Sequence, residues 1–426
     1  MIKMIFFTLL FILFFEIFLY KLVNFLRNYY KNSHNWIENR YVTNIITKER
    51  DFFPRINKSD LSRFKLFMHD KYLGSVYKKN TTVVESYFNK KKIRTKYNIQ
   101  KNGARNNKLF NKKDNISTYG DSLAFCRYVN DNETWQYYLS KKTKSNVKNF
   151  GVGNYGLDQS FLRYKKNKND KSKILIFAIG PETIRRNLSL WKHYYEFGNI
   201  YYFKPAFIIS KKQKLIKKEI PLKNISEKTN FLRVHNKIKK YDVFYKEKFL
   251  KYMWSKPYTL SLFNNFFRKS SLIIFFTSKY LEICFKSKII KKINKKVFPS
   301  FNLLGGLKFD FEDRLKYFKN KDYYNNSLEL IKLIQKDSKK NNKKVLLLIM
   351  PAHYDLINIK QKKTNYYQEF IDSCKKDINC LDLSKYLNKN CSTLFADKGF
   401  GGHYNHVGNK LISEILYKYL KKINYI

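Results

Sequence analysis

The sequence predicts an α/β protein whose parallel sheet is covered by helices on both faces. Apolar runs of strand length alternate with helical runs from residue 115 to the C-terminus, which is the pattern of βαβ units. The runs ILIFAI at 174–179 and VLLLIM at 345–350 are apolar without interruption, as in strands buried on both faces. Glycine-rich or unusual polar turns follow several strand-like runs, at the edge where parallel sheets collect functional side chains.

The elements of this alternation can be assigned in chain order. A first strand is expected in NISTYGDS (115–122), which joins a short extended run to a Gly-Asp-Ser turn. ETWQYYLSKKTK (133–144) has helical spacing, and SNVKNFGVGNYG (145–156) predicts a second strand that ends in Gly-rich turns. The remaining expected elements are a strand at 172–183, a helix at 325–342, a strand at 343–351, a helix at 365–376, a strand entering a helix at 378–387 and a closing helix at 405–423.

Two segments do not follow the alternation. Residues 28–114 are polar, rich in aromatic residues and weakly periodic, which predicts a stem or accessory segment with irregular or hairpin structure. A second segment, at about 190–320, interrupts the α/β pattern and predicts a mostly helical insertion. Its apolar run at 271–285 contains Lys279 and Glu282 and is too short to span a membrane, so we expect a buried helix there.

The N-terminal residues 1–27 predict a membrane anchor. MIFFTLLFILFFEIFLY (4–20) is almost wholly apolar and, with the following KLVNFL, reaches the about 20 residues that a spanning helix needs. Because no small-residue cleavage site follows, a retained anchor is favoured over a cleaved signal peptide. Glu16 lies within the run, and an acid in a membrane usually has a partner. Basic residues stand on both sides, so the membrane side of the body stays open; we assume a single-pass protein of a bacterial inner membrane.

The charge of the chain is extreme but evenly distributed. The formal net charge is +53, which is compatible with binding to nucleic acid or to an anionic membrane. Lysines are spread along the whole chain, however, and Asn, Ile, Tyr and Phe are also frequent, which favours a compositional bias. No zinc-finger, RNP-like or helix-turn-helix signature occurs, so no nucleic-acid partner is expected. The five cysteines have no CxxC spacing, and neither a metal site nor a cofactor is predicted.

Three short motifs occur at predicted strand ends in a fixed order: YGDSLAF (119–125), NFGVGNYGLDQ (149–159) and GGHYNHVGN (401–409). Together they resemble the first, second and last sequence blocks of the SGNH/GDSL hydrolases. The resemblance covers about residues 115–190 and 340–426 and leaves the middle uncovered. It implies that residues 115–426 form a three-layer α/β/α, flavodoxin-like sandwich with a central parallel sheet, interrupted by the insertion.

The resemblance assigns roles to individual residues. Ser122 would be the nucleophile, its own N–H would donate to the oxyanion, and His403 would be the base. An oxyanion donor in the second block falls on Asn154, flanked by Gly153, and Asn tolerates a positive φ better than most residues. Taken alone, Ser122 is as compatible with an ordinary helix cap as with a nucleophile.

The chain departs from the family pattern at two positions. Glu182 stands where the third block normally has an Asn donor, and an ionised carboxylate donates no hydrogen bond. Either Glu182 points away, or Asn187 substitutes for it, or catalysis is weak. Phe400 stands where the family has an Asp before the His, so that Asp397, Asp382 or a backbone carbonyl would orient the imidazole.

The function implied is that of a membrane-anchored serine ester hydrolase, an O-acyl esterase or deacylase without a metal or organic cofactor. Its partners would be an acylated small molecule or a surface carbohydrate, and the membrane through the N-terminal helix. Two alternatives stay open at this point. One is an O-acyltransferase on the same fold, and the other is a non-catalytic carbohydrate-binding or assembly protein.

Overall fold

The computed structural model describes most of the chain and divides it into two compact units. The first unit holds Met1–Asn57, Trp191–Tyr202 and Glu227–Asp310, and the second holds Lys58–Leu190, Phe203–Ser226 and Phe311–Ile426. Each unit has a hydrophobic core of its own. The described residues are 2–31, 56–89, 91–107, 109–110, 115–196, 199–210, 212, 214–251, 253–297, 314–387, 391–397 and 402–426.

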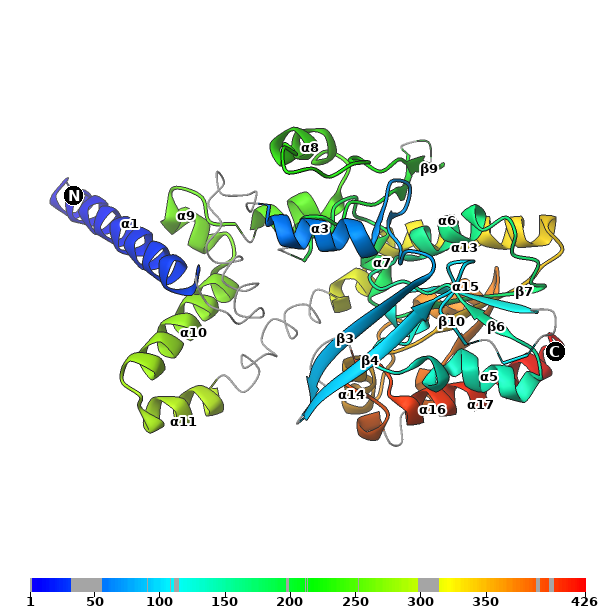
Figure 1. The fold of residues 1–426 in the computed structure, drawn as a ribbon. Coiled ribbons are helices and arrows are strands. Elements are labelled where there is room, and N and C mark those ends of the chain that lie inside the picture. Colours follow the sequence, from blue (N-terminus) through cyan, green and yellow to red (C-terminus); the bar gives the residue numbers. More distant parts are fainter. Residues whose placement is uncertain are drawn as a thin grey trace. The chain divides into compact units, whose positions relative to one another are not determined.

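The second unit is built on a parallel sheet of five strands (Figure 1). The spatial order is β6 (Val147–Asn149), β5 (Ile116–Gly120), β7 (Ile174–Ile179), β10 (Lys344–Ile349) and β11 (Asn379–Asp382), all hydrogen-bonded in parallel. In chain order this is 2-1-3-4-5, the arrangement of flavodoxin-like folds, in which ligands bind outside the carboxyl ends of the strands. The predicted flavodoxin-like parallel sheet is confirmed.

Both faces of the sheet are covered, which explains why β7 is apolar throughout. Leu175, Phe177 and Ile179 lie in one core cluster, together with residues of α6 (Leu157–Lys166), α13 (Lys321–Lys340) and α15 (Gln368–Lys375). The alternate residues of the strand lie in a second cluster with α5 (Trp135–Thr143) and α17 (His406–Lys422). Figure 1 shows α6 and α13 on one side of the sheet and α5 and α17 on the other, so the three layers are those expected from the sequence.

Short elements connect these layers or lie beside them. A long antiparallel hairpin precedes the sheet and consists of β3 (Thr81–Asn89) and β4 (Lys91–Ile99). The other elements of the second unit are α3 (Lys58–Phe67), β1 (His69–Asp70), β2 (Gly74–Ser75), α4 (Ser122–Phe125), η2 (Asp131–Glu133), α7 (Thr183–Arg186), β8 (Ala206–Ile209), β9 (Leu215–Lys218), α14 (His353–Lys362), α16 (Ser384–Leu387) and η5 (Cys391–Thr393).

Arg105 fastens the polypeptide after this hairpin to the sheet domain. Its backbone forms an antiparallel bridge to Asn149, at the end of the edge strand β6. Its guanidinium is fully buried and donates to the carbonyl oxygens of Phe125, Cys126 and Val129 at 2.7, 2.8 and 2.5 Å. Because these carbonyls follow the Gly-Asp-Ser turn, the described part of the segment 28–114 helps to fix the backbone of that turn.

The first unit is mostly helical, as predicted for the insertion. Its elements are α1 (Ile2–Lys31), η3 (Lys192–Tyr194), α8 (Phe231–Ile238), a π-helical turn at Tyr245–Leu250, α9 (Tyr258–Phe263), α10 (Phe266–Cys284) and α11 (Lys288–Val297). Within the described residues, Lys3–Leu26 of α1 is the one stretch long and apolar enough to cross a membrane, as an anchor or as a signal sequence. Leu19, Val23 and Leu26 pack in one core cluster with residues of α9 and α10.

The expectation of a buried helix at 271–285 needs a correction. A helix is present, but it is buried on one face only: Leu272 and Phe276 lie in the core, whereas Ile274 and Leu281 are exposed. The apolar run led to the wrong expectation because hydrophobic periodicity does not reveal which medium an apolar face contacts.

Candidate active site

The Gly-Asp-Ser turn at the end of β5 presents Ser122 at the carboxyl edge of the sheet. A Cβ atom at Gly120 would lie 1.8 Å from the carbonyl oxygen of Ala178 on β7, so only glycine allows this approach. Asp121 is the N-cap of α4, and its Oδ1 accepts the N–H of Leu123 at 2.8 Å. Ser122 is therefore the first helical residue and not the cap, and its hydroxyl is left for other contacts.

The side chain of His403 reaches Ser122 from the other end of the domain. Its Nε2 lies 2.9 Å from Ser122 Oγ, and its Nδ1 lies 3.1 Å from Asp397 Oδ2. Asp397 also accepts the backbone N–H of His403. With a carboxylate on Nδ1, the neutral imidazole carries its proton there and leaves Nε2 to accept the proton of the Ser122 hydroxyl. The structure thus brings three of the sequence-predicted site residues into one hydrogen-bonded chain.

Asp382, the other acid considered as the partner of the imidazole, and Asn405 of the last motif form other contacts. Asp382 accepts hydrogen bonds from the N–H and hydroxyl of Ser384 and from the hydroxyl of Tyr367. Asn405 caps α17, because its Oδ1 accepts the N–H of Gly408 at 3.0 Å. Phe400, the residue at the position of the family's Asp, lies outside the described residues.

The Gly-rich turn after β6 lies beside the hydroxyl-bearing turn. A Cβ atom at Gly153 would be 4.0 Å from the Cβ of Ser122, and Asn154 has a φ of +70°. The N–H of Val152 donates to the Gly120 carbonyl at 3.0 Å and holds the two turns together. Within the described part of the chain, the N–H groups of Ser122, Gly153 and Asn154 have no hydrogen-bond acceptor, which is the condition that an oxyanion site requires.

Glu182 lies in a cluster of paired charges. Its carboxylate contacts Arg186 Nη2 at short distance, Arg314 Nη2 at 3.2 Å and Arg185 Nη2 at 3.8 Å. Arg314 in turn pairs with Asp355 through a contact of 2.6 Å. Burial alone would lower the pKa of Arg314, but the negative charge of Asp355 raises it, so this guanidinium stays charged.

The charged cluster also contacts the Gly-Asp-Ser turn. Arg186 Nη1 lies 3.4 Å from Asp121 Oδ2, and the Gly180 N–H donates to the same oxygen at 3.3 Å. Burial raises the pKa of the fully buried Asp121, and the charge of Arg186 opposes that shift. Sequence reasoning did not identify Arg314 and Asp355, because Arg314 is 132 residues from its partner Glu182 and Asp355 is 41 residues from its partner Arg314.

The side-chain amide of Asn187 is hydrogen-bonded to α6 and α13. Its Nδ2 donates to Ser327 Oγ on α13 at 2.8 Å, and its Oδ1 accepts the N–H of Asp158 at 3.3 Å. The side chain is 1% exposed. In this arrangement the amide links α7, α6 and α13.

A group of residues that the motifs do not contain surrounds the imidazole. The ring of Tyr128 packs edge-to-face against His403, with centroids 5.1 Å apart. The Tyr128 N–H donates to the hydroxyl of Tyr97 at 3.0 Å, and that hydroxyl donates to Glu85 at 2.9 Å. Glu85 also forms an ion pair with Arg127. The only signal in the sequence is the placement of Arg127 and Tyr128 directly after the first motif.

Burial alone would raise the pKa of Glu85, but the hydrogen bonds and charge of Arg127 hold it below its usual value. The hairpin β3–β4 therefore contributes an ionised carboxylate to the surroundings of the imidazole. Among the residues that the structure describes, no three His, Cys, Asp or Glu side chains are grouped so as to hold a metal ion.

Comparisons with known proteins show a distant likeness among solved structures. No family model matches the chain, and no curated protein sequence matches it. Among solved structures, the chain is similar to a protein assigned to the G-D-S-L family of lipolytic proteins, from Desulfitobacterium hafniense DCB-2. The identity is 11%, the TM-score is 0.32, and the match covers 72% of this chain and 99% of the other. A likeness of this extent carries no argument about function.

Proposed function

We propose that this chain is a membrane-anchored serine ester hydrolase that removes O-acyl groups. The observation that carries the proposal is the continuous chain from Ser122 Oγ through His403 to Asp397, with contacts of 2.9 and 3.1 Å. A nucleophile within hydrogen-bond reach of a base, itself oriented by a third group, is the arrangement that activates a hydroxyl for acyl transfer. Its place at the carboxyl edge of a flavodoxin-like sheet is where such folds bind ligands.

The reaction follows from the geometry. Ser122 Oγ attacks the ester carbonyl while His403 Nε2 accepts the hydroxyl proton, and Asp397 stabilises the imidazolium that forms. The N–H groups of Ser122, Gly153 and Asn154 are the candidates to donate to the tetrahedral oxyanion. His403 then donates its proton to the departing alcohol, which leaves an acyl-serine. Water, deprotonated by the same imidazole, attacks this intermediate and releases the carboxylic acid.

Retention of α1 as an anchor is supported by its contacts inside the first unit. Glu16 Oε1 accepts the N–H of Tyr258 at 2.6 Å, and its Oε2 accepts the N–H and hydroxyl of Thr259 at 2.7 and 3.0 Å. Cleavage of α1 as a signal would leave these donors at the start of α9 without Glu16 and would uncover the core around Trp254. The partner expected for the acid in the apolar run is therefore the N-terminus of another helix.

The substrate class that we propose is an O-acyl ester of a carbohydrate or small molecule at the membrane surface. The anchor and the basic, aromatic-rich composition support this choice.

The test is covalent labelling with a fluorophosphonate probe, followed by assay with an activated aryl ester. The wild-type chain is expected to be labelled and to hydrolyse the ester, whereas Ser122→Ala does neither. Ser59→Ala, an exposed serine of α3, is the matched control and keeps both activities. Folded wild-type protein that takes up no probe would refute the hydrolase. Labelling without hydrolysis, together with acyl transfer to an added sugar, would assign transfer instead.

A further inference from the structure

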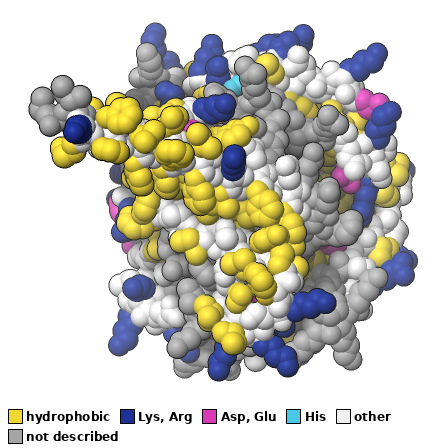
Figure 2. Space-filling view, turned by 90° about the vertical axis from the view of Figure 1, so that its left-hand side faces the viewer, with side chains coloured by type: hydrophobic (Ala, Val, Ile, Leu, Met, Phe, Trp, Pro, Cys, Tyr) yellow, Lys and Arg dark blue, Asp and Glu magenta, His cyan; other side chains and the backbone are white. Residues whose placement is uncertain are grey.

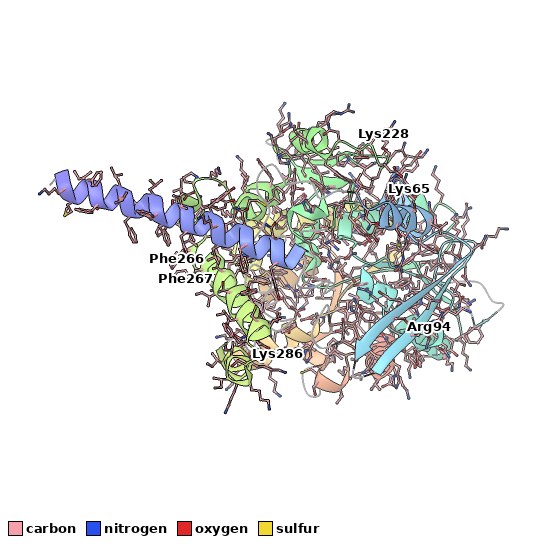
Figure 3. All side chains as sticks on the ribbon, turned by 60° about the vertical axis from the view of Figure 1, so that its left-hand side comes forward. Lys65, Arg94, Lys228, Phe266, Phe267 and Lys286 are labelled. Atoms are coloured by element: carbon pink, nitrogen blue, oxygen red, sulfur yellow. The ribbon has the colours of Figure 1, made fainter. Side chains whose placement is uncertain are left out.

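Helices α9 and α10 expose an apolar surface that the proposed reaction does not use. Phe263, Phe267 and Phe285 leave 67%, 84% and 70% of their surface exposed, and Ile274 on the same helix pair leaves 55%. Soluble monomers rarely expose contiguous apolar patches beyond a few hundred Å², and larger ones mark contact surfaces. Figure 2 faces this side and shows hydrophobic side chains gathered in a band. Figure 3 shows Phe266 and Phe267 projecting outward at the start of α10.

The same stretch exposes no charge. All residues from 257 to 285 are described, and none of the exposed ones among them is Asp, Glu, Lys or Arg. Lys256 and Lys286, which flank the stretch, are both exposed. In a chain with 28% charged residues, 29 consecutive residues without an exposed charge call for a cause other than composition.

The four charged residues inside the stretch, Arg268, Lys269, Lys279 and Glu282, are buried or partly buried. Lys269 donates from Nζ to the carbonyl oxygens of Met253 and Ser261 and to Ser261 Oγ, at 2.5 to 2.9 Å. Lys279 forms an ion pair of 3.0 Å with Glu282, and Arg268 is 7% exposed. The internal contacts of Lys269, Lys279 and Glu282 are of the kind that a lipid environment demands, because hydrocarbon offers no hydrogen bonds.

The apolar surface is continuous with the spanning helix. Leu19, Val23 and Leu26 of α1 pack against the inner face of α9 and α10, and Glu16 holds the N-terminus of α9. The apolar stretch of α1 ends at Leu26. Glu16 lies ten residues before that end, a distance of about 15 Å along a helix. A helix whose start is tied to α1 at that depth lies within the hydrocarbon of the bilayer that α1 spans.

We propose that residues 257–285 insert into the bilayer as a helical hairpin in one leaflet, beside α1. The inference rests on the proposed anchoring of α1. Lys286 marks the point where the chain returns to the anionic lipid headgroups. Lys256, two residues before Tyr258, stays beside α1, with its Nζ 5.3 Å from the centre of the Tyr20 ring. On α11, Ile289 and Ile293 are exposed at a spacing of four residues next to exposed Lys288, which continues the same surface as an interfacial helix.

The experiment uses the full chain in vesicles of phosphatidylcholine with and without phosphatidylglycerol. Cys284 and Cys391, the cysteines that are not buried, are first replaced by Ser. Single cysteines labelled with an environment-sensitive fluorophore then report their surroundings at Phe11 in α1, at Phe267 in α10, and at Leu232 in α8 as the matched control. All three side chains are at least half exposed, so their replacement leaves the core intact.

At Phe267 we expect a blue shift and a loss of most of the emission when the lipids carry a quencher on the acyl chain, as at Phe11. At Leu232 neither change is expected. Lys286→Gln should reduce the part of the quenching at Phe267 that depends on phosphatidylglycerol. Quenching at Phe11 but not at Phe267 would refute the insertion and leave the anchor standing. Crosslinking of Phe267 positions between two chains without quenching would identify a second copy as the occupant and also refute it. No quenching at Phe11 would remove the anchor and the insertion together.

Discussion

The turns after β5 and β7 follow neighbouring parallel strands at the same edge of the sheet, yet one presents an uncharged hydroxyl and the other an ion-paired carboxylate. The first turn presents the neutral hydroxyl of Ser122 to an imidazole at 2.9 Å. The second turn concentrates charge, because Glu182 is surrounded by three guanidinium groups. Position at the edge of a parallel sheet therefore does not decide what a turn does; the partners that each side chain meets decide it.

The two turns are coupled through one carboxylate. Asp121 caps α4 with Oδ1, while its Oδ2 accepts the N–H of Gly180 and faces Arg186. Arg186 is in turn held by Glu182. In this arrangement Glu182 acts as a counterion that positions Arg186, and Arg186 steadies the turn that carries Ser122. We call the turn after β5, which carries Ser122, the reacting turn, and the turn after β7, which carries Glu182, the supporting turn. Each of the following predictions tests this division.

The largest effect is expected from the reacting turn. Ser122→Ala and His403→Ala should each lower kcat/KM for an activated ester by about 10⁴- to 10⁶-fold, because removal of either member of the pair disables the nucleophile. The double variant should be no worse than the single ones, since the two residues act as a unit. Steady-state kinetics with Ser59→Ala as control would measure this. A Ser122→Ala enzyme within tenfold of wild type would assign the reaction to another residue.

Asp397→Asn should lower kcat/KM by about 10³- to 10⁴-fold, a smaller loss than at Ser122, because the amide no longer stabilises the imidazolium. Asp382→Asn is the matched control, since the sequence left either acid open as the partner. Asp382 bonds to Ser384 and Tyr367, so its replacement should change the free energy of unfolding and leave kcat largely intact. The opposite ranking of the two variants would transfer the orienting role to Asp382.

The parts of the molecule that sequence predicted are those governed by local pattern. Burial on both faces forces uninterrupted apolar runs on β7 and β10, and this requirement is visible in the residues themselves. The order of three motifs also indicated Ser122 and His403 as a pair, although 281 residues separate them. Their geometry agrees with that hypothesis, and their catalytic roles stay predictions until activity is measured.

The parts that sequence did not predict depend on pairing between distant charges. In a chain with 86 basic residues, nothing singles out Arg314 as the partner of Glu182. No sequence motif marks the hairpin that brings Glu85 to Arg127, because strand pairing does not depend on which residue of the strand is acidic. Nor does an apolar run tell whether its exposed face meets protein or lipid, which is why the helix at 271–285 was expected to be buried.

Arg186→Met should destabilise the second unit by about 3–5 kcal/mol, because it leaves the buried Asp121 and its neighbour Glu182 without their shared cation. Urea unfolding of the variant and of Arg185→Met gives the comparison. Arg185 is equally buried on the same short helix, but its contact with Glu182 is longer, at 3.8 Å, so its loss should cost less. Equal costs for the two variants would mean that the contact with Asp121 contributes nothing.

The variant Glu182→Gln distinguishes two roles of this residue: a counterion that holds Arg186, or an acid that faces the oxyanion at the position of the family's Asn donor. As a counterion, Glu182 loses ion pairs on replacement, and the free energy of unfolding should fall by about 1–3 kcal/mol while kcat does not rise. An acid that faced the oxyanion would repel it, and the amide would then increase kcat by donating a hydrogen bond. A rise in kcat at unchanged stability would therefore overturn the role of the β7 turn as a support.

The smallest effect is expected from Glu85 on the β3–β4 hairpin, and it is a change in how stability depends on pH. The pKa of Glu85 lies below its usual value of 4.5, so at a pH between the two values the unfolded chain binds a proton that the folded chain does not. The stabilisation from the pair with Arg127 is thus fully present above about pH 5 and is lost as the pH falls through the folded pKa. Glu85→Gln should remove this pH dependence. The difference in unfolding free energy between wild type and variant should then shrink from neutral pH toward pH 3. A difference that stays constant over this range would mean that Glu85 has the same pKa in the folded and the unfolded chain, so that its ion pair with Arg127 contributes no net stability.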